Sequence, residues 1–155
     1  GIRKILLING HGGNDFTPLV RQIQADLDVF MFWCHVYEVG QDKHNEIFDT
    51  VDDHAGELET SMALALFPEL VELEQADSGA LRPFQFEALD RGWIKTSRKF
   101  SNLNDHCGNS DPSLATAEKG KQYLDFICQR ISNFLIELSE AEVNDHFPHF
   151  PEIKH

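Results

Sequence analysis

The sequence predicts an α/β fold with a parallel sheet, on the basis of two apolar runs and the helical pattern between them. Ile5 to Ile8 form a continuous aliphatic run, as expected for a strand that is covered on both faces. Asp28 to Tyr37 (DVFMFWCHVY) is rich in aromatic and β-branched residues, which indicates a second buried strand. Because strand, helix and strand follow one another closely, we expect parallel strands joined by a right-handed crossover.

The helix between the two strands is predicted by apolar residues that recur at helical spacing. Thr17 followed by Pro18 is a favourable pair for an N-cap and a first turn, so we expect the helix to begin there. The residues of its apolar stripe are Phe16, Leu19, Val20, Ile23 and Leu27.

The middle of the chain is less regular. Residues 40–53 are polar and predict a loop, and Ala55 to Phe67 predicts a short apolar helix that Pro68 ends. Short strands are expected around Leu70 to Leu73 and Gly92 to Thr96.

The last third of the chain predicts the longest helix. Asp111-Pro112-Ser113 is expected to start this helix, which then continues to about Glu140. We therefore predict one α/β domain over residues 1–141, followed by an irregular tail over 142–155 that contains two prolines and three histidines. The expected core face of the helix comprises Leu124, Ile127, Ile131, Phe134, Leu135 and Leu138.

Composition excludes several classes of function. The 155 residues have a net charge of -13, so the surface repels phosphate backbones and nucleic acid is not an expected partner. No apolar stretch approaches the length that crosses a bilayer, so no membrane partner is expected. The three cysteines are widely spaced and form no CxxC, which favours a reducing cytoplasm over a disulfide framework or a zinc ribbon.

The first candidate site is the loop Asn9-Gly10-His11-Gly12-Gly13-Asn14, which we call the glycine loop. It follows a buried strand, and ligands of parallel sheets collect beyond the carboxyl ends of the strands. It matches neither a dinucleotide fingerprint nor a phosphate loop. A histidine among glycines therefore indicates metal binding or acid–base chemistry, with a structural hydrogen bond as the alternative.

The second candidate site is Asp52-Asp53-His54-Ala55-Gly56-Glu57-Leu58-Glu59. Glu59 shares a helical stripe with apolar Met62, Ala63 and Leu66, whereas the stripe of Glu57 is more polar. We therefore expect Glu59 to face the buried side, where a divalent cation, a salt bridge or hydrogen bonds would compensate its charge. We interpret His35, His44, His106 and Asp105 as surface or structural residues.

Three motifs in this order, ILLINGHGGN, DDHAGELETSMAL and DPSLATAEKG, resemble the creatininase (creatinine amidohydrolase) family. They span residues 5 to 120, and their combination is specific although each alone is weak. The resemblance implies a three-layer α/β/α sandwich with a mostly parallel sheet. It also implies a metal-dependent amidohydrolase of small molecules, commonly oligomeric, with a pair of divalent ions (zinc, manganese or iron).

The resemblance also implies roles for individual residues. His11 and Glu59 would be metal ligands, and His54 would be the catalytic histidine beside a metal-activated water. His54 would pass a proton to the leaving nitrogen. The backbone N–H groups of Gly12 and Gly13 could bind the oxyanion, and with Asn14 they form the expected substrate-binding group.

The sequence departs from the family pattern in two places. Gly12 and Gly13 stand where creatinine-hydrolysing members have a Tyr-Glu pair. This difference favours the HGGN branch of the family, whose substrates are varied, over creatinine as the substrate. The family's first metal motif, an acid-x-His followed by an aspartate, is not in the chain and would precede Gly1. Gly1 itself suits the end of a helix or a tag remnant. We therefore expect a C-terminal portion of a longer domain, whose metal site would be incomplete alone.

Two other functions compete with amide hydrolysis. The chain could be a non-catalytic α/β scaffold or assembly domain that keeps part of the metal site. It could also belong to a hydrolase that uses one metal for phosphoester chemistry, although the motifs contain few Lys and Arg residues for an anionic substrate.

Overall fold

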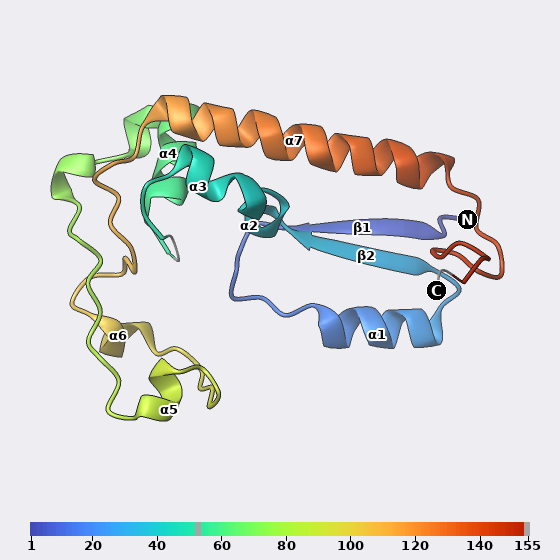
Figure 1. Cartoon of the computed structure of the whole chain (residues 1–155), viewed down its shortest axis with the longest axis horizontal. Coiled ribbons are helices and arrows are strands. Elements are labelled where there is room, and N and C mark those ends of the chain that lie inside the picture. The colour runs from blue at the N-terminus through green and yellow to red at the C-terminus, as the bar shows by residue number, and fades with distance from the viewer. Residues whose placement is uncertain (52–53, 154–155) are drawn as a thin grey trace. The chain divides into compact units, whose positions relative to one another are not determined.

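The computed structural model describes residues 1–51 and 54–153, and these form two compact units. The first unit comprises residues 1–41 and 127–155, and the second comprises residues 42–126. The boundary falls inside the last helix, α7 (Ala117–Glu140), so each unit contains part of this helix (Figure 1).

Two parallel strands form the sheet of the first unit, as the sequence predicts. Strand β1 (Lys4–Asn9) pairs with β2 (Phe30–His35), and their first and last residues face each other across the ladder. Strand β2 is shorter than the predicted stretch because the following residues form the short helix α2 (Val36–Val39).

Helix α1 (Thr17–Asp26) connects the strands, but its predicted N-cap is wrong. Thr17 is the first helical residue, and Phe16 occupies the cap position without a side-chain hydrogen bond. Asp15 supplies the polar partner instead, because its Oδ1 accepts a hydrogen bond from the Thr17 N–H at 2.9 Å. This hydrogen bond lowers the pKa of Asp15 below its usual value.

The first unit has three layers, because α1 and the C-terminal part of α7 cover opposite faces of the strands (Figure 1). Phe32 of β2 contacts Phe134 of α7 edge to face, with ring centroids 5.8 Å apart. Lys4 also joins the sheet to the end of α7, where a cation is favourable beside free carbonyl groups. Its Nζ donates to the carbonyl oxygens of Leu138, Ser139 and Ala141 at 2.5, 3.0 and 2.8 Å.

The second unit is helical in the residues that the structure describes. It contains α3 (His44–Ile47), α4 (Glu57–Leu66), α5 (Glu87–Asp90), α6 (Phe100–Leu103) and the first part of α7. The predicted loop at 40–53 is wrong in part, since it holds α3 and a 3-10 turn at Gln41–Lys43. Its last two residues, Asp52 and Asp53, lie outside the described residues.

The strands predicted in the second unit are wrong. The stretch around Leu70 to Leu73 lies in two 3-10 turns, Pro68–Leu70 and Leu73–Gln75, and residues 92–96 form no regular element. A strand needs a neighbouring strand to hydrogen-bond, and both described strands of the chain belong to the other unit. A short apolar run alone does not show whether another strand lies beside it.

Helix α7 begins at Ala117, six residues after the predicted start at Asp111. Thr116 Oγ1 accepts a hydrogen bond from the Lys119 N–H at 3.2 Å, in the manner of an N-cap. Of the predicted core face, Ile127 and Leu138 are buried, but Phe134 and Leu135 are exposed. The most buried side chain of this helix is Tyr123, which the sequence analysis missed and which packs against Phe48.

Helices α4 and α7 approach each other backbone to backbone at Ser61 and Gly120. A Cβ atom on Gly120 would lie 1.9 Å from the Ser61 carbonyl oxygen, so only glycine fits there. Ser61 is fully buried, and its Oγ accepts a hydrogen bond from the Thr116 N–H at 3.1 Å. This contact fixes the start of α4, which carries the second candidate site.

Residues 142–153, where the sequence predicts an irregular tail, contain no helix or strand. Within the described part of the chain, we find no helix with the length and apolar character that a membrane span requires.

Candidate functional site

The glycine loop is organised by Asn9, a residue to which the sequence analysis gave no role. Asn9 ends β1 and is only 5% exposed. Its Oδ1 accepts hydrogen bonds from the His11 N–H at 3.2 Å and from Asn14 Nδ2 at 3.0 Å. Its Nδ2 donates to the His11 carbonyl oxygen and lies near His35 Nδ1, both at 2.6 Å. One amide side chain therefore joins both ends of the loop.

The imidazole ring of His11 is held over Gly13. A Cβ atom on residue 13 would lie 2.8 Å from His11 Nε2, so the glycine leaves room for the ring. Among the described residues, no hydrogen bond or ion pair involves either ring nitrogen of His11. His11 is exposed, so its nitrogens can bind a ligand that the protein itself does not supply.

The structure brings His54 and Glu59 together in the second unit. Ala55 has a φ of 54°, a left-handed conformation that turns the chain between His54 and the start of α4. Glu59 Oε2 accepts a hydrogen bond from the Ala55 N–H at 2.6 Å and lies 3.7 Å from His54 Nδ1. Glu59 thus reaches back over the helix start, like the acidic residue of a capping box.

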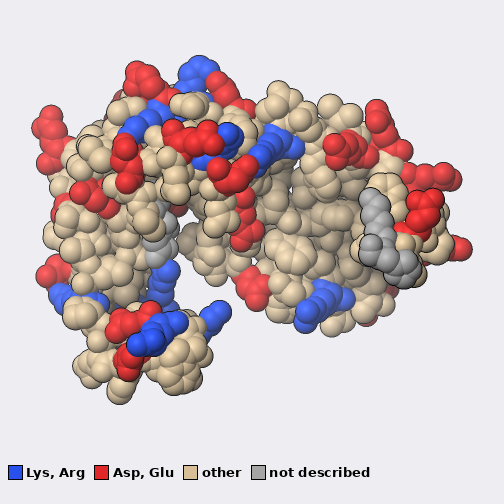
Figure 2. Space-filling view, in the orientation of Figure 1, with Lys and Arg blue, Asp and Glu red and all other residues tan. Residues whose placement is uncertain are grey.

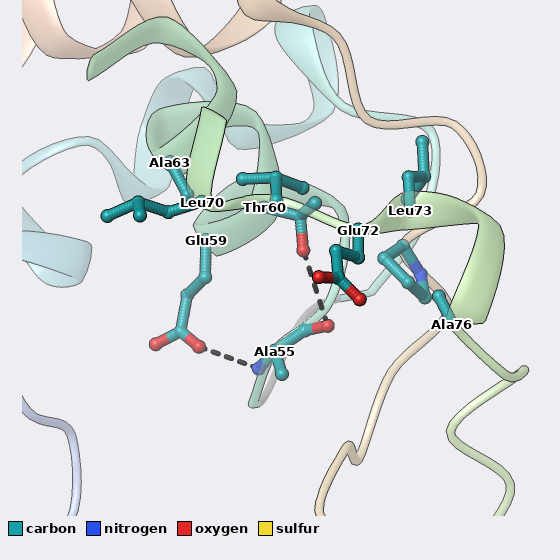
Figure 3. Close-up of a pocket in the computed structure, with 10 residues that line it drawn as sticks. Ala55, Glu59, Thr60, Ala63, Leu70, Glu72, Leu73 and Ala76 are labelled. Atoms are coloured by element: carbon teal, nitrogen blue, oxygen red, sulfur yellow. Dashed lines mark hydrogen bonds between the residues drawn. The ribbon is translucent and has the colours of Figure 1, made fainter. Parts of the chain in front are cut away.

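The second oxygen of the Glu59 carboxylate remains available. No described residue donates a hydrogen bond to Oε1, and the side chain is 28% exposed. Figure 3 shows the carboxylate with one oxygen directed at Ala55 and the other directed away from the residues drawn. A carboxylate oxygen and an imidazole nitrogen are donor types that suit zinc, manganese and iron, so Glu59 and His11 are each, within their own unit, of a type that can bind a divalent cation.

The expected burial of the two glutamates is reversed. Glu57, not Glu59, is fully buried, and Lys119 of α7 forms an ion pair with its Oε1. Its Oε2 accepts hydrogen bonds at 2.9 Å from the Asp49 N–H, the Thr50 N–H and Thr50 Oγ1. Helical periodicity failed here because the polar stripe of α4 faces α7, where Gly120 lets the helices touch.

The environment of Glu57 keeps this buried group charged. Burial alone would raise the pKa of Glu57, but the hydrogen bonds from Lys119, Thr50 and Asp49 outweigh it and lower the pKa. Lys119 also pairs with Asp49 at 2.8 Å, and the hydrogen bonds to Asp49 and Glu57 raise the pKa of Lys119. This network ties residues 49–50, a few positions before His54, to the start of α7.

An aromatic contact also holds His54. The ring of Phe100, on α6, meets the imidazole edge to face with centroids 5.3 Å apart. The carbonyl oxygen of His54 accepts a hydrogen bond from the Asn109 N–H at 2.8 Å. No sequence pattern pointed to Phe100 or Asn109, because each is more than 40 residues from His54 along the chain.

A hollow of about 370 Å³ lies beside Glu59 within the second unit (Figure 3). Its walls are mostly apolar, and its charged groups are the carboxylates of Glu59 and Glu72. A cavity of this size and lining suits a small organic molecule. The hollow is lined by Ala55, Glu59, Thr60, Ala63, Leu70, Val71, Glu72, Leu73, Ala76 and Pro112.

The other histidines considered as ligands have structural or surface contacts. His35 lies against Asn9, His44 packs against Phe48, and His106 pairs with Asp77 at 3.3 Å. Within residues 1–51 and 54–153, no three His, Cys, Asp or Glu side chains are grouped so that they could hold a metal ion. The glycine loop and Glu59 belong to different units.

Comparison with known proteins identifies the family. The sequence model of the family described as "Creatininase: Creatinine amidohydrolase" matches residues 1–135. The chain belongs to the creatininase family. The resemblance of its three motifs is thereby confirmed, and each motif lies within the matched residues.

Solved structures of creatininases share the fold. A candidate creatinine amidohydrolase from Bacteroides fragilis is 31% identical with a TM-score of 0.85, and the match covers 94% of this chain and 57% of that chain. A mutant creatininase complexed with creatine has 23% identity and a TM-score of 0.61, over 91% and 59% of the chains. A manganese form has 20% identity and a TM-score of 0.63, over 88% and 56%.

These matches confirm the predicted creatininase-like α/β fold, of which the described residues hold two parallel strands. The chain spans less than two thirds of the length of each of these creatininases. No curated protein matches the chain.

Proposed function

We propose that this creatininase-family protein hydrolyses a carbon–nitrogen bond, in a linear or cyclic amide, of a small molecule. Its family membership supports the reaction class. The observation that carries the proposal is the pairing of His54 with Glu59, 3.7 Å apart, on a left-handed turn beside a hollow of small-molecule size. This arrangement combines a proton carrier, a carboxylate and a binding cavity.

We propose that His11 and Glu59 hold divalent cations, two in each complete site, together with ligands that these residues do not supply. Two observations on the described residues support this assignment: none of them bonds to the ring nitrogens of His11, and none donates to Glu59 Oε1. Related structures are a manganese form and a form described as Zn-Zn type, which supports zinc or manganese, with iron as a further candidate. When bound, such cations lower the pKa of water and supply hydroxide at neutral pH.

The residues of the chain then have distinct roles. His54 gives a proton to the leaving nitrogen as the carbon–nitrogen bond breaks and its electron pair moves to that nitrogen. Glu59 Oε2 lies 3.7 Å from His54 Nδ1 and orients the imidazole for this step. The N–H groups of Gly12 and Gly13 bind the carbonyl oxygen of the substrate, and Asn14 contacts the substrate beside them.

The substrate is proposed to be a small amide other than creatinine itself. Gly12 and Gly13 support this, because they replace the Tyr-Glu pair of creatinine-hydrolysing enzymes. We further propose that the protein is a homo-oligomer, as its resemblance to the family implies. We also propose that it lies in the cytoplasm, since all three cysteines are free thiols.

The experiment that tests this function uses the full-length protein, purified with zinc or manganese. The metal content of the protein is measured by elemental mass spectrometry. Hydrolysis of creatinine and of linear and cyclic amides is followed through the amine that is released. His54→Ala should retain the bound metal and slow turnover about 10²–10⁴-fold, the usual loss for a general acid–base. His106→Ala, which removes an exposed histidine, should leave both properties unchanged.

Two outcomes would contradict the proposal. A His54→Ala protein with a near-normal rate would remove His54 from the chemistry. A full-length protein that carries no divalent metal and hydrolyses no amide would instead support the non-catalytic assembly domain.

A further inference from the structure

The imidazole ring of His54 has no hydrogen bond that fixes its direction among the described residues. Its Nδ1 lies 3.7 Å from Glu59 Oε2, which is longer than a hydrogen bond, so this carboxylate orients the ring only in part. No described residue bonds to Nε2. A group that transfers a proton must keep one nitrogen directed at the receiving atom, so the remaining contacts of the ring decide how well His54 can act.

Phe100 makes such a contact with the imidazole of His54. The ring centroids are 5.3 Å apart and the planes are inclined by 69°. This edge-to-face arrangement is one that aromatic pairs prefer, and it restricts rotation of the imidazole. Phe100 is 38% exposed, so a leucine at this position would open no cavity in the core. The contact can therefore be removed without unfolding the second unit.

Residues 100–109 hold His54 at two points. Phe100 contacts the imidazole, and the Asn109 N–H donates a hydrogen bond to the His54 carbonyl oxygen at 2.8 Å. Between these two contacts, Asn104 Nδ2 donates to the Gly108 carbonyl oxygen at 2.6 Å and closes the turn after α6. One short segment therefore fixes both the backbone and the ring of His54.

The group that this segment presents to the imidazole is apolar. The neighbouring charged side chains of Arg98 and Lys99 are exposed, and Figure 2 shows Lys and Arg side chains at the surface over α5 and α6. Among the residues that the structure describes, Glu59 is the one charged group close enough to the imidazole for an ion pair. Phe100 therefore acts on His54 through ring shape and dispersion, which affect the direction of the nitrogens.

We propose that Phe100 is a positioning residue that directs the imidazole of His54 toward the leaving nitrogen. The inference rests on the proposed function of His54. As the carbon–nitrogen bond breaks, its electron pair moves to the nitrogen, which takes the proton from His54. An imidazole that turns away from this nitrogen cannot deliver the proton, so loss of the Phe100 ring slows this step without weakening substrate binding.

The test compares variants of the full-length, zinc-loaded protein on the linear and cyclic amides described above. We expect Phe100→Leu to lower kcat about 10–100-fold, because a misdirected catalytic group loses rate, while KM and bound zinc stay unchanged. Phe100→Tyr keeps the aromatic ring and should retain the wild-type kcat. The matched control is Phe84→Leu, at a 50% exposed position of the same unit, and it should change neither kcat nor KM.

A double-mutant cycle distinguishes positioning from a general structural role. If Phe100 acts through His54, Phe100→Leu should cause no further loss of kcat in a His54→Ala protein. An equal loss in both backgrounds would overturn the inference. So would a change in KM alone, or a loss in Phe100→Tyr as large as that in Phe100→Leu.

A readout without catalysis separates this inference from the proposed function. Diethyl pyrocarbonate acylates accessible imidazoles, and peptide mass spectrometry measures the rate at each histidine. We expect Phe100→Leu to raise the rate at His54 several-fold relative to exposed His106, and Phe100→Tyr and Phe84→Leu to leave it unchanged.

The two failures then differ in their results. An unchanged labelling rate of His54 in Phe100→Leu, or amide hydrolysis that Phe100→Leu does not slow, would overturn the inference alone. A raised labelling rate in a protein that hydrolyses no amide would instead overturn the proposed function, and with it the role of Phe100 in proton transfer.

Discussion

The carboxylate of Glu57 has no exposed surface and pairs with the ammonium group of Lys119 at the start of α7. The same carboxylate holds the backbone of Asp49 and Thr50, so one charge joins α7 to the segment before His54. A charge in such a place is stable only while all its partners are present.

We first expect Glu57→Gln to destabilise the second unit strongly. Removing the charge leaves Lys119 with fewer compensating partners and weakens the hydrogen bonds to Asp49 and Thr50, at a cost of about 3 kcal/mol in the free energy of unfolding. Denaturant unfolding measures this cost. Glu46→Gln, which breaks the exposed pair with Lys43, should cost less than about 1 kcal/mol. Equal effects of the two changes would contradict the role of burial.

The pH dependence of the stability difference between wild type and Glu57→Gln follows from the pKa shifts of Glu57 and Lys119. The pKa of Glu57 is lowered from 4.5, so its contribution is complete above that pH and is lost as the pH falls through the lower folded-state value. The pKa of Lys119 is raised from 10.5, so its contribution is present below that pH and is lost as the pH rises through the higher folded-state value. The stability gap between wild type and Glu57→Gln should therefore be constant near neutrality and narrow at both extremes. A gap that widens in acid would contradict this.

Glu59 offers a test that separates a structural role from a ligand role. Glutamine also accepts a hydrogen bond at the helix start, so Glu59→Gln should keep the contact with the Ala55 N–H and a near-wild-type melting temperature. It should lower the bound divalent metal of the full-length protein, because the negative charge is gone. Glu59→Ala should lose both properties. Unchanged metal in Glu59→Gln would reject Glu59 as a ligand.

Asn9 is expected to control the order of the glycine loop. Asn9→Ala removes the side-chain amide that hydrogen-bonds to His11 and Asn14. The change should lower the free energy of unfolding by about 1–3 kcal/mol and raise amide hydrogen exchange at residues 10–13. Asn14→Ala removes only one of these bonds and should have a smaller effect on both measurements. If Asn9→Ala leaves exchange in the loop unchanged, the loop does not depend on this side chain.

Gly120→Ala tests the contact between α4 and α7. The added methyl group would overlap the Ser61 carbonyl, so the two helices must separate. We therefore expect a clearly lower melting temperature of the protein. Glu118→Ala, at an exposed position of the same helix, is the control and should change little. A Gly120→Ala protein as stable as the control would show that the helices can move apart without loss.

The local features of the chain were predictable from the sequence. The aliphatic run and the Asp28 to Tyr37 stretch predicted two parallel strands, and the glycine loop follows the first of them as expected. The three motifs identified the family that the comparison confirms. These predictions succeed because each depends on residues close together along the chain, whose periodicity and turn chemistry fix the local structure.

The tertiary structure decided which polar groups are buried and what they contact. Periodicity assigned the buried carboxylate to Glu59, but Lys119 and Gly120, some 60 residues away, made Glu57 the buried one. Phe100 beside His54 and Asn9 beside His35 are likewise contacts between distant positions. The sequence determined the two strands of the first unit, the glycine loop and the family. Burial depends on which helix faces pack together, and only the folded chain contains those contacts.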